Sequence, residues 1–245
     1  MVQPDRRFGA AVRTGTTARE GIDQGLRAFM LGIYNNMALG LAITAIASLA
    51  TTYMAQTNPA VAQALYGSPL KWVVMFAPLV FVFAFSAAVN RMAPAKARLV
   101  FFAFSAVMGI SISWIFLVYS SASIAQTFFV TSAAFAGLSL WGYTTKKDIS
   151  AWGSFLIMGV IGLIIAMVVN LFLQSSALQF AVSGLGVLIF AGLTAYDTQN
   201  LKNTYDLVAG DETAAGRVSV IGALRLYLDF LNLFMFLLHF MGGRD

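Results

Sequence analysis

The chain contains no cysteine, one histidine and few charged residues, and each shortage removes a class of function. Without cysteine there can be no disulfide framework, thiolate catalyst or cysteine-bound metal centre. With His239 as the single imidazole, a multi-histidine metal site is excluded as well. Charged residues make up 10% of the chain and hydrophobic residues 59%. Because a soluble domain is about one-quarter charged, the excess apolar surface is expected to face lipid.

Long apolar runs follow one another at short intervals. We expect spans near Ala28–Thr52, Trp72–Val89, Leu99–Tyr119, Ile124–Tyr143, Trp152–Leu173, Ala177–Tyr196 and Ile221–Met241. Each approaches the ~20 residues that cross the hydrocarbon core of a bilayer, where backbone polar groups must be satisfied within the segment. The sequence therefore predicts an all-α integral membrane protein with seven transmembrane helices. They form one domain, residues 27–245.

Two polar segments flank or interrupt these runs. Residues 1–26 form an N-terminal tail that lacks the apolar core of a signal peptide. Within the tail, Thr17-Ala-Arg-Glu20 has the spacing of a capping box, which indicates a helix start. Asn200–Val220 is expected to be a long loop between the sixth and seventh spans.

The basic residues predict the orientation in the membrane. Those in the tail and the second–third, fourth–fifth and sixth–seventh connections are Arg6, Arg7, Arg13, Arg19, Arg27, Arg91, Lys96, Arg98, Lys146, Lys147, Lys202 and Arg217. On the other side we find Lys71 and Arg244. The positive-inside rule places the N-terminus in the cytoplasm and the C-terminus outside, unless the last segment is re-entrant. The rule also accounts for the net charge of +5 without a nucleic-acid partner.

Two aspartates stand at membrane depth, where ionisable groups are costly and usually functional. Asp197 ends the sixth apolar run, and Asp229 lies about two turns inside the seventh. Adjacent ends of consecutive spans can bring the two side chains together. Two close carboxylates in a poorly hydrated setting cannot both ionise without a large penalty, so they would share a proton. The pair is therefore a candidate proton sensor and ion gate, with no catalytic residue predicted.

Simpler explanations exist for each of these charged residues. Asp197 could be a helix-end aspartate solvated in a loop. Arg225 precedes Asp229 by one helical turn, so the two could form an intrahelical ion pair, or Arg225 could extend to the lipid headgroups and leave Asp229 free. Arg91, at the same face, is either a positive-inside anchor or a latch for the aspartates.

Deprotonated, the two aspartates would offer oxygen ligands to a hard cation. Calcium takes six to eight oxygens, so Asn200, Asn232, carbonyl groups or waters would have to complete the coordination of Asp197 and Asp229. Only a weak calcium site is implied, with calcium as a permeant or transiently bound ion and no resident cofactor. His239, about 15 Å deeper than Asp229, is expected to be a packing residue near the outer interface.

Three segments resemble the signature segments of a known family. Ala195-Tyr-Asp-Thr-Gln199 and Leu226-Tyr-Leu-Asp-Phe-Leu-Asn-Leu-Phe234 are similar to those of the Bax inhibitor-1 (transmembrane Bax inhibitor motif) family, close to its bacterial YccA-like branch. Gly109-Ile-Ser-Ile-Ser113 also resembles the family pattern. The resemblance covers the whole membrane region in the number and order of spans.

The resemblance implies a fold in which the other helices surround the last one, and a pH-sensitive calcium leak. The family's hydrogen-bonded di-aspartyl unit maps onto Asp197 and Asp229. Arg91 is the candidate for the second-helix arginine that holds one aspartate in the closed state. The expected protein is thus a multi-pass calcium leak channel of the bacterial inner membrane, and not an enzyme.

Two other functions compete with the leak. The YccA-like branch is associated with the membrane-anchored AAA protease FtsH, so the protein could be its modulator or substrate, with the tail as a handle. An intramembrane aspartyl protease also pairs aspartates from adjacent helices, one in a setting like Tyr196-Asp197. Such proteases place the partner aspartate after Gly-x-Gly, whereas Asp229 follows Leu228, and no proline occurs beyond Pro94 for their later Pro-Ala-Leu segment.

Overall fold

The protein folds into a bundle of long helices, seen in a computed structural model that describes the backbone of residues 6–243 and the side chains of residues 24–243. The elements are α1 (Arg6–Thr57), α2 (Pro59–Ala62), the π-helical turn η1 (Gln63–Gly67), α3 (Leu70–Ala88), the 3₁₀ turn η2 (Val89–Arg91), α4 (Pro94–Ile112), α5 (Ile115–Val118), α6 (Ser121–Thr144), α7 (Trp152–Leu173), α8 (Ser176–Val208) and α9 (Glu212–Met241). No strand occurs within residues 6–243.

Seven helical segments of the described chain are long and apolar enough to cross a membrane. They are Gln24–Thr57, Leu70–Arg91, Pro94–Val118, Ser121–Thr144, Trp152–Leu173, Ser176–Val208 and Glu212–Met241. Large apolar side chains cover their outer faces, and Phe172 is 83% exposed. The predicted all-α membrane fold of seven spans is confirmed.

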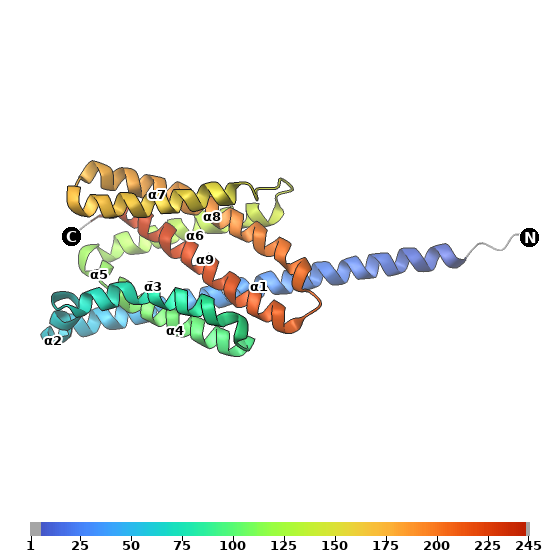
Figure 1. The fold of residues 1–245 in the computed structure, drawn as a ribbon, viewed down its shortest axis with the longest axis horizontal. Helices are drawn as coiled ribbons and strands as arrows, with labels where there is room; N and C mark the ends of the chain where they lie inside the picture. The colour runs from blue at the N-terminus through green and yellow to red at the C-terminus, as the bar shows by residue number, and fades with distance from the viewer. Residues whose placement is uncertain (1–5, 244–245) are drawn as a thin grey trace, which may run out of the picture.

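The last helix lies at the centre of the bundle. In the most apolar 18-residue window of α9, 61% of residues are buried, compared with 33% or less in the other six spans. Figure 1 shows α9 running diagonally between two helix groups, one formed by α6, α7 and α8 and the other by α1, α3 and α4. It packs against α8, α1, α6 and α4. The predicted central position of the last helix is therefore observed.

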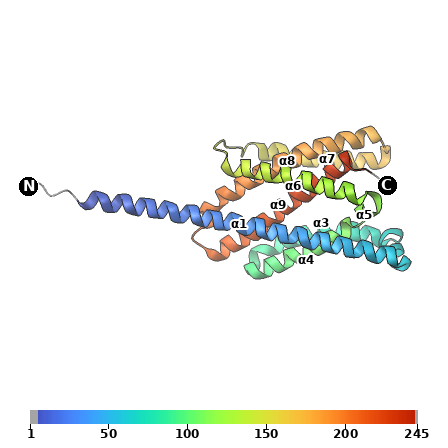
Figure 2. The same ribbon diagram turned by 180° about the vertical axis from the view of Figure 1, so that it is seen from behind.

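The ends of the bundle differ in which connections they carry. The α3–α4, α6–α7 and α8–α9 connections lie at the end from which α1 projects, and α9 finishes at the opposite end (Figures 1 and 2). Because α9 is one continuous helix, the last span is not re-entrant. Arg244, counted on the far side, lies outside the described residues.

Two predicted boundaries are wrong. The chain between Asn200 and Val220 is not a long loop, because α8 continues to Val208 and α9 already begins at Glu212. The side chain of Asp211 caps α9 by accepting hydrogen bonds from the backbone amides of Thr213 at 2.8 Å and Ala214 at 3.0 Å. The end of an apolar run marks where lipid contact ends, and a helix can continue beyond that point.

The N-terminal tail shows the same effect. Helix α1 begins at Arg6 and runs without a break into the first span, so the predicted start at Thr17 is wrong. The polar tail residues continue the helix of the first span instead of starting a separate element. Side chains there, including those of the predicted capping box, lie outside the described part.

Candidate functional site

Asp197 on α8 and Asp229 on α9 meet at the interface of the two helices. A side-chain hydrogen bond joins their carboxyl groups. Ionised carboxylates only accept hydrogen bonds, so one of the two groups must carry a proton for this bond to form. Asp229 is 5% exposed, and Asp197 is half-buried. The two carboxyl groups thus face each other across the α8–α9 contact.

Asp229 lies among fully buried apolar side chains of the central helix. Leu226 is completely buried, and Phe230 is 4% exposed. One carboxyl oxygen, Oδ2, is buried with no hydrogen-bond partner among the described residues. A negative charge on such a group would be poorly solvated and costly. Asp229 is therefore held in an apolar environment at the centre of the bundle.

Arg225 is the cation nearest in sequence to this pair, one turn before Asp229 on α9. Its side chain is exposed, yet its positive charge acts on both Asp197 and Asp229. The carboxyl groups nonetheless bond to each other. Arg225 therefore reaches the surface, and its positive charge still acts on the two carboxyl groups.

Arg91 takes no part in this arrangement. It is exposed at the end of η2, and the charges that act on the two carboxyl groups include Arg225 but not Arg91. The cation that links this connection to the central helix is Arg217, whose Nε donates to the carbonyl of Met92 at 2.7 Å. Sequence reasoning counted Arg217 only as a basic loop residue.

The two asparagines proposed as supporting ligands lie one turn beyond the aspartates. The Asn232 side chain donates to the Leu228 carbonyl of its own helix at 2.8 Å. Asn200 is half-buried, and its backbone carbonyl accepts from Thr204. Among the described residues, no group of three or more histidine, cysteine, aspartate or glutamate side chains could hold a metal ion. The local oxygen donors are two carboxyl groups with amides nearby.

The residues that follow Asp197 fix α8 to the neighbouring helices. Thr198 Oγ1 hydrogen bonds to Ser139 Oγ of α6 at 2.9 Å, and Ser139 Oγ in turn bonds to Tyr34 of α1 at 2.6 Å. Gln199 accepts from the Ile149 amide at 3.0 Å and donates to the Lys147 carbonyl at 2.8 Å. These links connect α8 to α6 and to the α6–α7 connection.

Close backbone packing supports the same segment. A Cβ atom on Gly142 of α6 would overlap the Ala195 carbonyl oxygen. A Cβ atom on Gly153 of α7 would overlap the ring of Tyr196. Residues on both sides of Asp197 are thus held against α6 and α7, and its carboxyl is presented to α9 from a fixed position.

A separate set of contacts fixes α9. The hydroxyl of Tyr227, two residues before Asp229, is bonded to Thr44 of α1, whose Oγ1 donates to the Ser105 carbonyl at 2.9 Å. The rings of Phe101 and Phe104 of α4 pack edge-on against the Tyr227 ring, with centroids at 5.5 and 5.8 Å. Asp229 is consequently tied to α1 and α4, whereas Asp197 is tied to α6 and α7 and, through Ser139 and Tyr34, also to α1.

His239 lies far from the carboxyl pair. Its Nδ1 is 2.6 Å from the carbonyl oxygen of Met235, and its ring packs against those of Trp114 and Tyr119. These contacts agree with the packing role expected from the sequence.

The fold and the site together define a polytopic helical membrane protein with a di-aspartyl pair beside its central helix. The family described as "Inhibitor of apoptosis-promoting Bax1" matches residues 26–245. The chain belongs to this Bax inhibitor-1 family, as the resemblance predicted.

Bacterial relatives extend over almost the whole chain. An uncharacterised protein of Caulobacter vibrioides is 48% identical over 231 residues, covering 91% of each chain. A Rickettsia prowazekii protein is 42% identical, covering 94% of this chain and 96% of its own. The inner membrane protein YbhL of Escherichia coli is 41% identical, covering 90% of this chain and 93% of its own.

Proposed function

We propose that the protein is a pH-sensitive cation leak, with calcium as the main permeant ion, gated by the proton shared between Asp197 and Asp229. The observation that carries the proposal is the hydrogen bond between the two carboxyl groups beside the central helix. Protonated, the pair holds α8 against α9. Deprotonated, two adjacent anions repel each other, and the interface loosens.

The anchoring of the two aspartates supports this mode of opening. Asp197 is linked through Thr198 and Gln199 to α6 and the α6–α7 connection. Asp229 follows Tyr227, which is linked to α1. Repulsion between the carboxylates therefore acts across the α8–α9 contact, between α9 and the helix group of α6, α7 and α8 (Figure 1). The freed oxygens would attract a hard cation, and carbonyl and amide oxygens could complete a transient coordination shell.

The proposed setting is a bacterial inner membrane with the N-terminus in the cytoplasm. The relative YbhL is named an inner membrane protein. The basic Arg91, Lys96, Lys146 and Lys147 belong to connections at the end of the bundle from which α1 projects (Figure 1). Positive residues concentrate on the cytoplasmic side of membrane proteins, so the carboxyl pair would sense cytoplasmic pH.

The test is calcium flux into liposomes that hold the purified protein and an enclosed indicator. We expect flux to rise as the pH is raised from 6 to 8, because loss of the shared proton leaves two adjacent carboxylates that repel each other. Asp197→Asn together with Asp229→Asn should abolish the pH response, since amides neither lose a proton nor repel. Asp206→Asn, an exposed change further along α8, should preserve it. Flux from the double variant that follows the wild-type pH curve would eliminate the proposal.

A second candidate function is regulation of a membrane-anchored AAA protease of the FtsH type. It is supported by α1, whose backbone continues beyond the bundle as a projecting helix (Figure 2). Co-purification of the full chain and of a chain lacking residues 1–23 with such a protease tests the idea. Association that depends on the projecting helix would support it, and association that survives the deletion, or none at all, would argue against this handle.

A further inference from the structure

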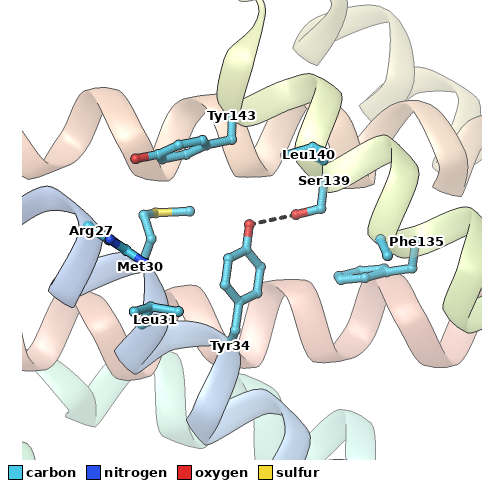
Figure 3. Close-up of a pocket in the computed structure, with 9 residues that line it drawn as sticks. Arg27, Met30, Leu31, Tyr34, Phe135, Ser139, Leu140 and Tyr143 are labelled. Atoms are coloured by element: carbon cyan, nitrogen blue, oxygen red, sulfur yellow. Dashed lines mark hydrogen bonds between the residues drawn. The ribbon is translucent and has the colours of Figure 1, made fainter.

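A cleft of about 450 Å³ lies between α1 and α6, apart from the carboxyl pair (Figure 3). Its lining residues are Arg27, Met30, Leu31, Tyr34, Phe135, Ala136, Ser139, Leu140 and Tyr143. Those of α1 recur at intervals of three and four residues, so they form one helix face. At ~1.5 Å per residue the cleft extends roughly 10–12 Å along the helices, which is most of the ~15 Å hydrocarbon depth of one leaflet.

The interior of the cleft suits a hydrocarbon chain. Most of its walls are apolar, and the rims formed by Leu31 and Leu140 are 56% and 64% exposed on the outer surface of the bundle. The hydroxyls of Tyr34 and Ser139 are bonded to each other at 2.6 Å. They therefore require no polar partner from a ligand.

One end of the cleft is positively charged. Figure 3 shows Arg27 and Tyr143 at one end and Phe135 at the other, with Tyr34 between them. Arg27 is exposed and has no hydrogen bond or ion pair with any residue whose side chain is described. A second cation lies beside this end, because Lys202 Nζ donates to the Tyr143 carbonyl at 2.8 Å and sits 5.3 Å from its ring centroid.

We infer that this cleft binds an anionic phospholipid of the surrounding bilayer, with one acyl chain along the α1–α6 cleft and the phosphate at Arg27. A guanidinium pairs with phosphate through two parallel hydrogen bonds. The exposed Leu31 and Leu140 place the cleft at the outer surface of the bundle, and its charged end lies toward the end of the bundle that carries the basic connections. An amphipathic anion is the one ligand that matches both ends of the cleft.

The site touches the proposed gate without depending on it. Tyr34 forms a wall of the cleft, and its hydroxyl is hydrogen bonded to Ser139. Ser139 is hydrogen bonded in turn to Thr198, the residue after Asp197. Lipid binding can therefore be measured on the protein itself, without any flux assay. If no lipid binds, the proposed leak is not affected. If the flux experiment fails, the proposed lipid site is likewise not affected.

Native mass spectrometry of the full chain, released from bilayers of equal parts phosphatidylglycerol and phosphatidylcholine, tests the charged end. We expect one phosphatidylglycerol to be retained in preference to phosphatidylcholine. Arg27→Gln should weaken this retention about 10-fold, as expected for the loss of a charged hydrogen-bond partner. Arg98→Gln removes another exposed cation at the same end of the bundle, and it should leave the retention unchanged.

A second pair of variants tests the apolar part. Ala136→Trp places a large ring in the cleft and should abolish phosphatidylglycerol retention. Ala133→Trp, an exposed change on the same helix outside the lining, should retain the lipid. Both positions are exposed, so the fold is kept, and a melting curve checks this. The inference would be overturned by any of three results. These are equal retention of the two lipids by the wild-type protein, equal loss of phosphatidylglycerol retention in the two arginine variants, and full phosphatidylglycerol retention in Ala136→Trp.

Discussion

The hydroxyl of Tyr227 on α9 is hydrogen bonded to the hydroxyl of Thr44 on α1, in the middle of the bundle. Tyr227 is fully buried, and Asp229 lies two residues further along the same helix. This bond sets the rotation of the central helix, and with it the direction in which the acidic side chain points. The proposed gate therefore depends on polar contacts distant from its own carboxyl groups.

Removal of that hydroxyl should weaken the bundle measurably. Tyr227→Phe is expected to cost about 0.6–1 kcal/mol, the usual range for one hydrogen bond inside a membrane protein. In a protein of this size that lowers the melting temperature by about 2–4 °C. Tyr53→Phe is the control, because Tyr53 is 69% exposed. Thermal unfolding in one detergent compares the two, and equal melting temperatures would refute a role for this bond.

A methyl group on Gly142 should destabilise the contact between α6 and α8. The added Cβ would overlap the Ala195 backbone oxygen, so the helices must separate. Such overpacking typically costs 1–3 kcal/mol. Gly137→Ala is a matched change on the same helix, where a Cβ meets nothing within 4 Å, and it should be neutral or slightly stabilising because alanine favours helix.

Chemical or thermal denaturation of the two alanine variants checks this prediction. A Gly142→Ala protein as stable as Gly137→Ala would mean that α6 and α8 do not approach each other as closely as described.

Arg225 and Arg91 should differ in their effect on gating. The positive charge of Arg225 acts on both carboxyl groups and favours their ionised forms. Arg225→Gln should therefore move the pH midpoint of calcium flux upward. Arg91→Gln should leave the midpoint in place. A shift that occurs only in the Arg91 variant would identify Arg91 as the latch and contradict this assignment.

The sequence was sufficient to predict the spans and to single out Asp197 and Asp229 as candidates, because apolar length and a charge within an apolar run are local signals. The sequence was insufficient to predict where the helices end. Hydropathy indicates which residues contact lipid, and both α8 and α9 extend beyond those residues. The links that fix α8 could not be predicted either. Tyr34 and Ser139 are 105 residues apart, and Gln199 meets a connection 50 residues away. Such partners are brought together by tertiary packing, and no local sequence pattern indicates which residues will meet.

The central claim is that the shared proton holds the two helix groups together, and a distance between the groups tests it most directly. The chain has no cysteine, so Lys96→Cys and Lys146→Cys, both at exposed positions, can carry spin labels on α4 and on the α6–α7 connection. Pulsed electron paramagnetic resonance in lipid nanodiscs should give a longer distance at pH 8 than at pH 6. The same labels in the Asp197→Asn, Asp229→Asn protein should give the short distance at both pH values. A distance that lengthens identically in this double variant would contradict the account.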